Sequence, residues 1–175
     1  MIGEFERLLI NFFDNRNKFF VISFPRITYN LHINVSNKIR GLLSNQFEII
    51  PIDYKDLISR SISNQKYHSN YLNFTIEQEI ENIVNEIGLF KQEKDKNFKI
   101  FVFYNLDIIL SYFKAKAQDN LELEKFWKEV FVNSCHNNFC ILLVSEIFEP
   151  DFSLIQIDKA KHNILREFKN NLGEI

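Results

Sequence analysis

Five polar side chains stand where the sequence could support chemistry on a phosphate group. Asn105 and Asp107 directly follow one short apolar segment, Glu146 follows another, and Arg26 follows a third. Lys38 lies further along the connection that Arg26 opens. Cations can hold phosphate oxygens, and carboxylate and amide oxygens are ligands that Mg²⁺ accepts. One hypothesis is therefore an unorthodox nucleotide site for ATP and Mg²⁺ that uses all five residues.

The same residues also fit structural roles, which are the commoner roles for such groups. Asn105 and Asp107 could form a turn or cap a helix, because short polar side chains hydrogen-bond to nearby backbone groups. Glu146 could be a solvated loop carboxylate. We therefore expect structural roles here and keep the nucleotide site as an alternative.

The connection after the first apolar segment lacks what an ordinary phosphate-binding loop requires. Such a loop needs glycines so that backbone N–H groups can surround the phosphates, a lysine for the β- and γ-phosphates, and a hydroxyl for magnesium. Residues 25–38 contain no glycine, and Lys38 is followed by Ile39 instead of serine or threonine. We therefore expect no orthodox nucleotide hydrolysis and no required cofactor, and the sequence leans away from an enzyme.

Cysteine and histidine provide a weaker candidate. Cys135, His136 and Cys140 have the residue types of a zinc site, but such a site needs four ligands, and Cys140 lies inside an apolar segment. A nucleophilic pair of Cys135 and His136 would need side chains that face each other, which sequence neighbours rarely do. We expect neither a metal site nor a catalytic residue here.

The charge balance limits the partners. A formal net charge of −2 gives no general attraction to a phosphate backbone, so nucleic-acid binding would need a local basic patch. Aromatic and basic residues in 60–71 could also stack on single strands, although a solvated loop is the commoner interpretation. A nucleic-acid-binding module stays an alternative, and the residues that would form its basic patch are Arg16, Lys18, Arg26, Lys38 and Arg40.

The elements that must position these residues alternate between strands and helices. Short, mostly apolar runs at 19–24, 47–52, 98–104 and 139–144 predict strands covered on both faces, as in a parallel sheet. Pro51 suggests an edge position or a strand end. Helical patterns lie near 5–13, 36–44, 54–63, 75–90, 123–131 and 164–172, and a last strand is expected near 154–157. The alternation predicts an α/β fold, a three-layer sandwich with a small, mostly parallel sheet.

Length and composition are those of one globular domain. Residues 1–175 are 46% apolar and 25% charged, with the core expected at about 5–150 and a strand and helix extension at about 151–175. No apolar run approaches the roughly 18 residues of a membrane span, so we expect no membrane partner. The first residues lack the basic region and cleavage site of a signal peptide, and two cysteines are too few for a disulfide framework. We therefore expect a cytoplasmic protein.

The order of elements resembles the core of a small P-loop NTPase of the AAA-like type. Within that group it looks most like the short BrxF proteins of BREX phage-defence systems. The resemblance covers about residues 5–150 and includes the second strand with Ile52-Asp53-Tyr54, and the third strand, which resembles a Walker B strand and leads into Asn105-Leu106-Asp107.

This resemblance implies an ATPase-like fold and work inside a multiprotein DNA-defence complex. The chain departs from the family because its phosphate-binding loop is missing and Asn105 stands where the family has a carboxylate. We therefore expect a non-catalytic, P-loop-NTPase-like subunit that acts through a protein partner, in phage defence or another DNA transaction.

Overall fold

The computed structural model describes residues 19–24, 33, 37, 47–65, 73–89, 98–116, 120–132 and 139–151. Its elements follow one another as β1 (Phe19–Phe24), β2 (Phe47–Asp53), α3 (Tyr54–Gln65), α4 (Ile76–Leu89), β3 (Phe98–Tyr104), α5 (Asp107–Lys116), α6 (Leu121–Val132), β4 (Phe139–Ser145) and the 3₁₀ turn η1 (Glu146–Phe148). All four strands predicted from the central apolar runs are confirmed, and so are the predicted helices that became α3, α4 and α6. The helices expected near 5–13 and 164–172 and the strand near 154–157 lie outside the described residues, as does most of 36–44.

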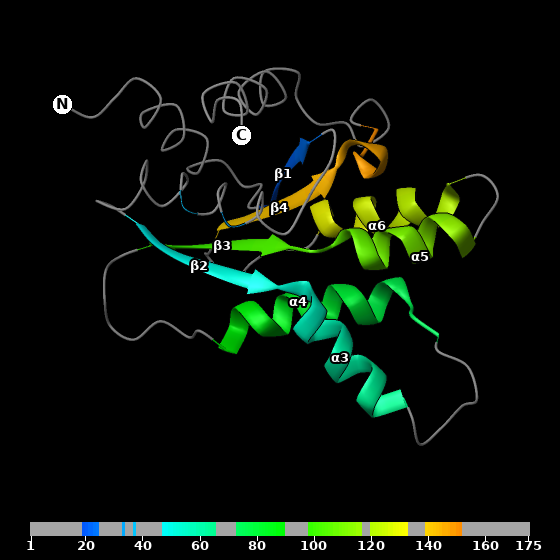
Figure 1. Ribbon diagram of the computed structural model, residues 1–175, viewed down its shortest axis with the longest axis horizontal. Helices are drawn as coiled ribbons and strands as arrows, with labels where there is room; N and C mark the ends of the chain where they lie inside the picture. Colours follow the sequence, from blue (N-terminus) through cyan, green and yellow to red (C-terminus); the bar gives the residue numbers. More distant parts are fainter. Residues whose placement is uncertain are drawn as a thin grey trace.

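The sheet has the strand order β1-β4-β3-β2, and each of its three strand pairs is parallel. In Figure 1 all four arrowheads point toward the same end of the sheet, and α3 and α5 begin at that end. The connection from β1 to β2 passes across two strands, whereas β2, β3 and β4 return toward β1 one neighbour at a time. Pro51 is exposed on β2, the strand that ends this row, which confirms the predicted edge position.

Both faces of this sheet are buried. On one face Phe103 of β3 and Leu142 of β4 share a single core with the four helices. On the other face Ile100, Val102 and Leu143 are also removed from solvent. Because successive strand residues point to opposite faces, this pattern confirms strands covered on both sides within an α/β fold.

The helices pack through the apolar stripes that their spacing predicts. In α4, Ile76, Ile80, Ile83 and Ile87 are buried, and the backbone N–H of Gln78 donates to Oγ1 of Thr75 at 3.3 Å. Thr75 therefore caps this helix. Helix α4 packs against α6, and α6 also packs against α5.

An aromatic group fills the junction of α5 and α6. Phe113, Phe126 and Trp127 are each buried, with ring centroids 5.6 Å and 5.2 Å apart along the series. The indole N–H of Trp127 donates to the backbone oxygen of Phe148 at 3.0 Å. This bond attaches η1, and with it the end of β4, to the helical layer. Within the described parts of the chain, no helix is both long and apolar enough to cross a bilayer.

Candidate functional site at the carboxyl edge of the sheet

The carboxyl ends of β2, β3 and β4 bring several polar residues to one edge of the sheet. In open parallel sheets this is the edge at which ligands bind. Asp53 ends β2, Asn105 follows β3, Asp107 opens α5, and Ser145 ends β4. Of the predicted site residues, Asn105, Asp107 and Glu146 lie here, whereas Arg26 and Lys38 lie outside the described residues.

Asn105 is joined to a residue that sequence analysis missed. Its amide Nδ2 donates to Oδ1 of Asp53 at 2.8 Å, and the backbone N–H of Lys55 donates to the same oxygen at 3.0 Å. This charge-assisted pair links the ends of neighbouring strands β2 and β3. The available signal was position, because Asp53 ends an apolar run in the same way that Asn105 follows the next one.

The backbone of Asn105 has a left-handed conformation, with φ at 62°. Asparagine tolerates this region better than most residues, and glycine adopts it freely. A tight left-handed residue lets the chain turn from β3 into α5 within Asn105 and Leu106. The structural interpretation of Asn105, a turn residue, therefore describes what it does in the fold.

Substitution of Asn105 separates its two contributions. We expect Asn105→Gly to lose the bond to Asp53 but keep the backbone geometry, lowering the free energy of unfolding by about 1 kcal/mol. Asn105→Ala should lose both, for a total of about 2 kcal/mol. Urea unfolding of the two variants checks the order. An alanine variant at least as stable as the glycine variant would contradict the role of the left-handed backbone.

Asp107 forms a second contact at this edge. Its Oδ1 accepts the backbone N–H of Ser145 at 3.0 Å, which joins the first turn of α5 to the end of β4. Burial raises the pKa of the Asp107 carboxyl, and the hydrogen bond from Ser145 opposes that rise in part. A carboxylate at a helix N-terminus also interacts favourably with the helix dipole.

Glu146 lies next to the Asp107–Ser145 contact as the first residue of η1, with its side chain exposed. The structure therefore brings Asp107 near Glu146 through Ser145. Asn105 belongs to the neighbouring contact with Asp53. Of the five residues in the nucleotide hypothesis, the described part of the structure contains Asn105, Asp107 and Glu146.

Side chains that commonly bind metals do not form a cluster among the described residues. Within that part of the chain, no three His, Cys, Asp or Glu side chains lie close enough to hold a metal ion. Cys140 is fully buried inside β4, in agreement with its place in an apolar segment. Cys135 and His136 lie outside the described residues.

A second polar group, also missed by sequence analysis, lies between α3 and α4. Here called the polar seam, it consists of Tyr54, Ser61, Glu79 and Asn82. The hydroxyl of Tyr54 donates to Oε2 of Glu79, and Nδ2 of Asn82 donates to Oγ of Ser61 at 2.9 Å and to Oε1 of Glu79 at 3.4 Å. Tyr54, Ser61 and Glu79 are buried.

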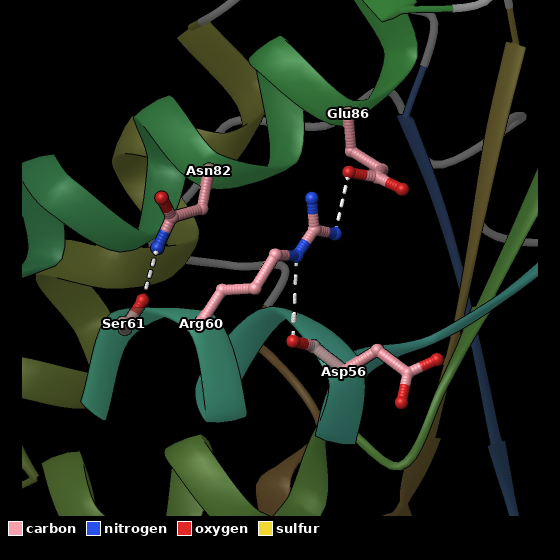
Figure 2. A network of polar contacts seen from close by, with 5 residues as sticks. All are labelled: Asp56, Arg60, Ser61, Asn82 and Glu86. Carbon is pink, nitrogen blue, oxygen red and sulfur yellow. Dashed lines mark hydrogen bonds and ion pairs between the residues drawn. The ribbon is translucent and has the colours of Figure 1, made fainter. Parts of the chain in front are cut away.

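The exposed side of the same two helices carries an ion pair. Figure 2 shows Arg60 reaching from α3 to Glu86 of α4, beside the Ser61–Asn82 contact. Nη2 of Arg60 lies 2.7 Å from Oε2 of Glu86, and Nε of Arg60 donates to the backbone oxygen of Asp56. An exposed pair of this kind adds at most about 1 kcal/mol.

Comparisons with known proteins add no relative. No family model matches the chain, and neither a curated protein nor a solved structure matches it significantly.

Proposed function

We propose that this protein is a non-catalytic subunit with an ATPase-like fold, which acts through protein contacts in a phage-defence or other DNA-transaction complex. The first support is topological. The connection from β1 runs across the sheet in the direction opposite to the β2–β3 and β3–β4 connections. Such a reversal marks the place where α/β sheets bind ligands, at the carboxyl edge.

The main observation behind the proposal is that polar groups at this edge form hydrogen bonds to one another. Oδ1 of Asp53 accepts two N–H groups, and Oδ1 of Asp107 accepts the backbone N–H of Ser145. These bonds hold the ends of β2, β3 and β4 together, and they engage Asn105 and Asp107, two residues of the nucleotide hypothesis. The absence of glycine from 25–38 supports the same interpretation.

Two exposed apolar side chains at this edge support a role in protein contacts. Ile108, the second residue of α5, is 47% exposed, and Ile147 in η1 is 62% exposed. Ile108 directly follows Asp107 and Ile147 lies two residues after Ser145, and the Asp107–Ser145 bond joins α5 to β4. Branched apolar groups at such a position supply contact area for a protein partner.

Thermal unfolding with and without millimolar ATP and Mg²⁺ tests the proposal. We expect no upward shift of the melting temperature, because residues 25–38 contain no glycine and Lys38 is not followed by serine or threonine. A true ligand at 100 times its dissociation constant would stabilise the folded state by about 2.7 kcal/mol.

The control compares two carboxylates near the same edge. Asp107→Ala removes the candidate ligand, whereas Asp56→Ala removes an exposed carboxylate in the first turn of α3. A nucleotide-dependent shift that Asp107→Ala abolishes and Asp56→Ala preserves would overturn the proposal in favour of a nucleotide site. Because each variant is compared with itself, a lower starting stability does not affect the result.

A further inference from the structure

Glu79 is a buried carboxyl group that has no cationic partner among the described residues. Its exposed fraction is 0%, and it is the one residue of a charged type that is buried in the part of the chain the structure describes. Its hydrogen-bond donors are the neutral hydroxyl of Tyr54 and the neutral amide of Asn82. A buried carboxylate normally requires a cation or several strong donors, so this arrangement favours the protonated acid.

The neighbouring elements do not neutralise it. From α3 the titratable group that faces Glu79 is Tyr54, while the cation of Arg60 is already paired with Glu86. The residues that α5 and α6 bury are apolar, and the charged residues of both helices are exposed or half-buried. Burial therefore dominates and raises the pKa of Glu79 above its ordinary 4.5, with the bonds from Tyr54 and Asn82 opposing it in part.

The seam holds two helices that otherwise make little backbone contact. Helix α4 packs closely on α6, whereas α3 reaches α4 mainly through side chains, which include the polar seam and the Arg60–Glu86 pair. The polar seam is also next to the carboxyl edge of the sheet, because Tyr54 directly follows Asp53, the acceptor for Asn105. The segment that carries Asp53 is therefore continuous with the start of α3.

We propose that Glu79 and Tyr54 form a proton-linked latch that holds α3 on α4, and that loss of the proton from Glu79 releases α3 and loosens the Asp53–Asn105 contact. The proton leaves the carboxyl group to solvent when α3 opens, and it returns when α3 closes.

The direction of the pH dependence follows from the raised pKa. In the open state water solvates Glu79, so its pKa returns to the ordinary value and the carboxyl ionises more readily. The closed state is therefore favoured at low pH, and opening increases as pH rises through the pKa of the closed state. With one proton released per opening, the open population rises by at most about tenfold per pH unit.

Hydrogen exchange of the full chain between pH 5 and pH 8 measures this opening. After correction for the intrinsic exchange rate, we expect protection of 54–65 to fall with pH by up to about tenfold per unit, while protection of α6 changes little. Glu79→Gln should remove the pH dependence from 54–65. Glu81→Gln, an exposed residue on the same helix, should leave it intact.

Carbon-13 titration of the carboxyl of Glu79 in the unmodified protein gives a readout that does not depend on any variant folding. We expect a midpoint above the ordinary 4.5, and a change in the side-chain amide signal of Asn105 with the same midpoint. A midpoint at or below the ordinary value would overturn the proposal. The proposal would also be overturned if protection of 54–65 had the same pH profile as protection of α6, or the same profile in the wild type as in Glu79→Gln.

Discussion

Replacement of Trp127 by alanine is expected to lower the free energy of unfolding by about 3–5 kcal/mol. Trp127 is 1% exposed and is the one tryptophan in the chain. Its ring lies against Phe126 at 5.2 Å and against Phe131 at 6.3 Å between centroids. Alanine would leave a cavity that these rigid aromatic neighbours cannot fill, so the lost contacts add to the lost burial.

Trp127→Phe separates packing from hydrogen bonding. Phenylalanine keeps most of the ring volume but removes the N–H that the backbone oxygen of Phe148 accepts. We expect a loss of about 1–3 kcal/mol, because that buried oxygen would lose its donor. Phe131→Ala, a half-buried aromatic on the same helix, provides the control and should be less damaging than Trp127→Ala.

Urea unfolding followed by circular dichroism measures all three variants, since fluorescence would lose its probe. In Trp127→Phe we also expect faster hydrogen exchange at 146–149, where the bond to the indole holds η1. A loss below about 1 kcal/mol for Trp127→Ala would mean that the helices do not enclose this ring.

The strands were predictable because burial on both faces leaves a direct mark on the sequence. Each strand has six or seven residues that are mostly apolar, although β2 contains Glu48 and β3 contains Lys99, and such runs in an α/β pattern belong to parallel sheets. The order of the strands was not predictable, because local apolarity carries no information about which neighbour a strand selects. Right-handed crossovers restrict the possible orders but allow several.

Helix α5 was missed for a local reason. Two residues separate its first residue from the end of β3, and its first turn carries the branched pair Ile108 and Ile109, which favour strands. The turn that separates the two elements rests on the left-handed backbone of Asn105. The interpretation of Asn105 as a turn residue agrees with this backbone, whereas the carboxylate of Asp107 accepts a bond from Ser145 of β4. The helix itself was not predicted.

The polar seam was missed because its partners are far apart in sequence. Tyr54 and Glu79 are separated by 25 residues, and each alone resembles a surface residue. One signal was nevertheless present. Glu79 lies three residues after Ile76 and four before Ile83, which places it within the apolar stripe of α4. A carboxyl group on such a stripe must be buried with donors, and those donors cannot be identified before the helices are placed.

Removal of the Tyr54 hydroxyl is expected to destabilise the protein more as pH rises. Tyr54→Phe keeps the ring in its fully buried position but removes the donor to Oε2 of Glu79. At pH 5 we expect a loss of about 1 kcal/mol, the usual worth of one hydrogen bond. At pH 8 the loss should reach about 3 kcal/mol, because a buried ionised carboxyl without its donor is penalised more heavily.

The sign follows from the effect of the hydroxyl on Glu79. Burial raises the pKa of Glu79, and the bond from Tyr54 lowers it in part. Without that bond the folded-state pKa rises further, while the pKa in the unfolded chain is unchanged. Both proteins lose stability as pH rises through their folded-state pKa, and the variant goes on losing it to a higher pH.

Tyr112→Phe is the matched control for this comparison. The hydroxyl of Tyr112 contacts the side-chain amide of Asn73 and the backbone N–H of Phe74, and both of these partners are neutral groups. Its removal should lower stability by the same amount at pH 5 and pH 8. Trp127 fluorescence in urea suits both variants, because each keeps the indole.

A difference between wild type and Tyr54→Phe that stays constant with pH would mean that Glu79 holds its charge state across this range. A difference that grows with pH, beside a constant one for Tyr112→Phe, would identify the hydroxyl of Tyr54 as the group that makes ionisation of Glu79 tolerable. Because Tyr54 directly follows Asp53, this pH dependence would then connect the protonation of Glu79 to the carboxyl edge of the sheet.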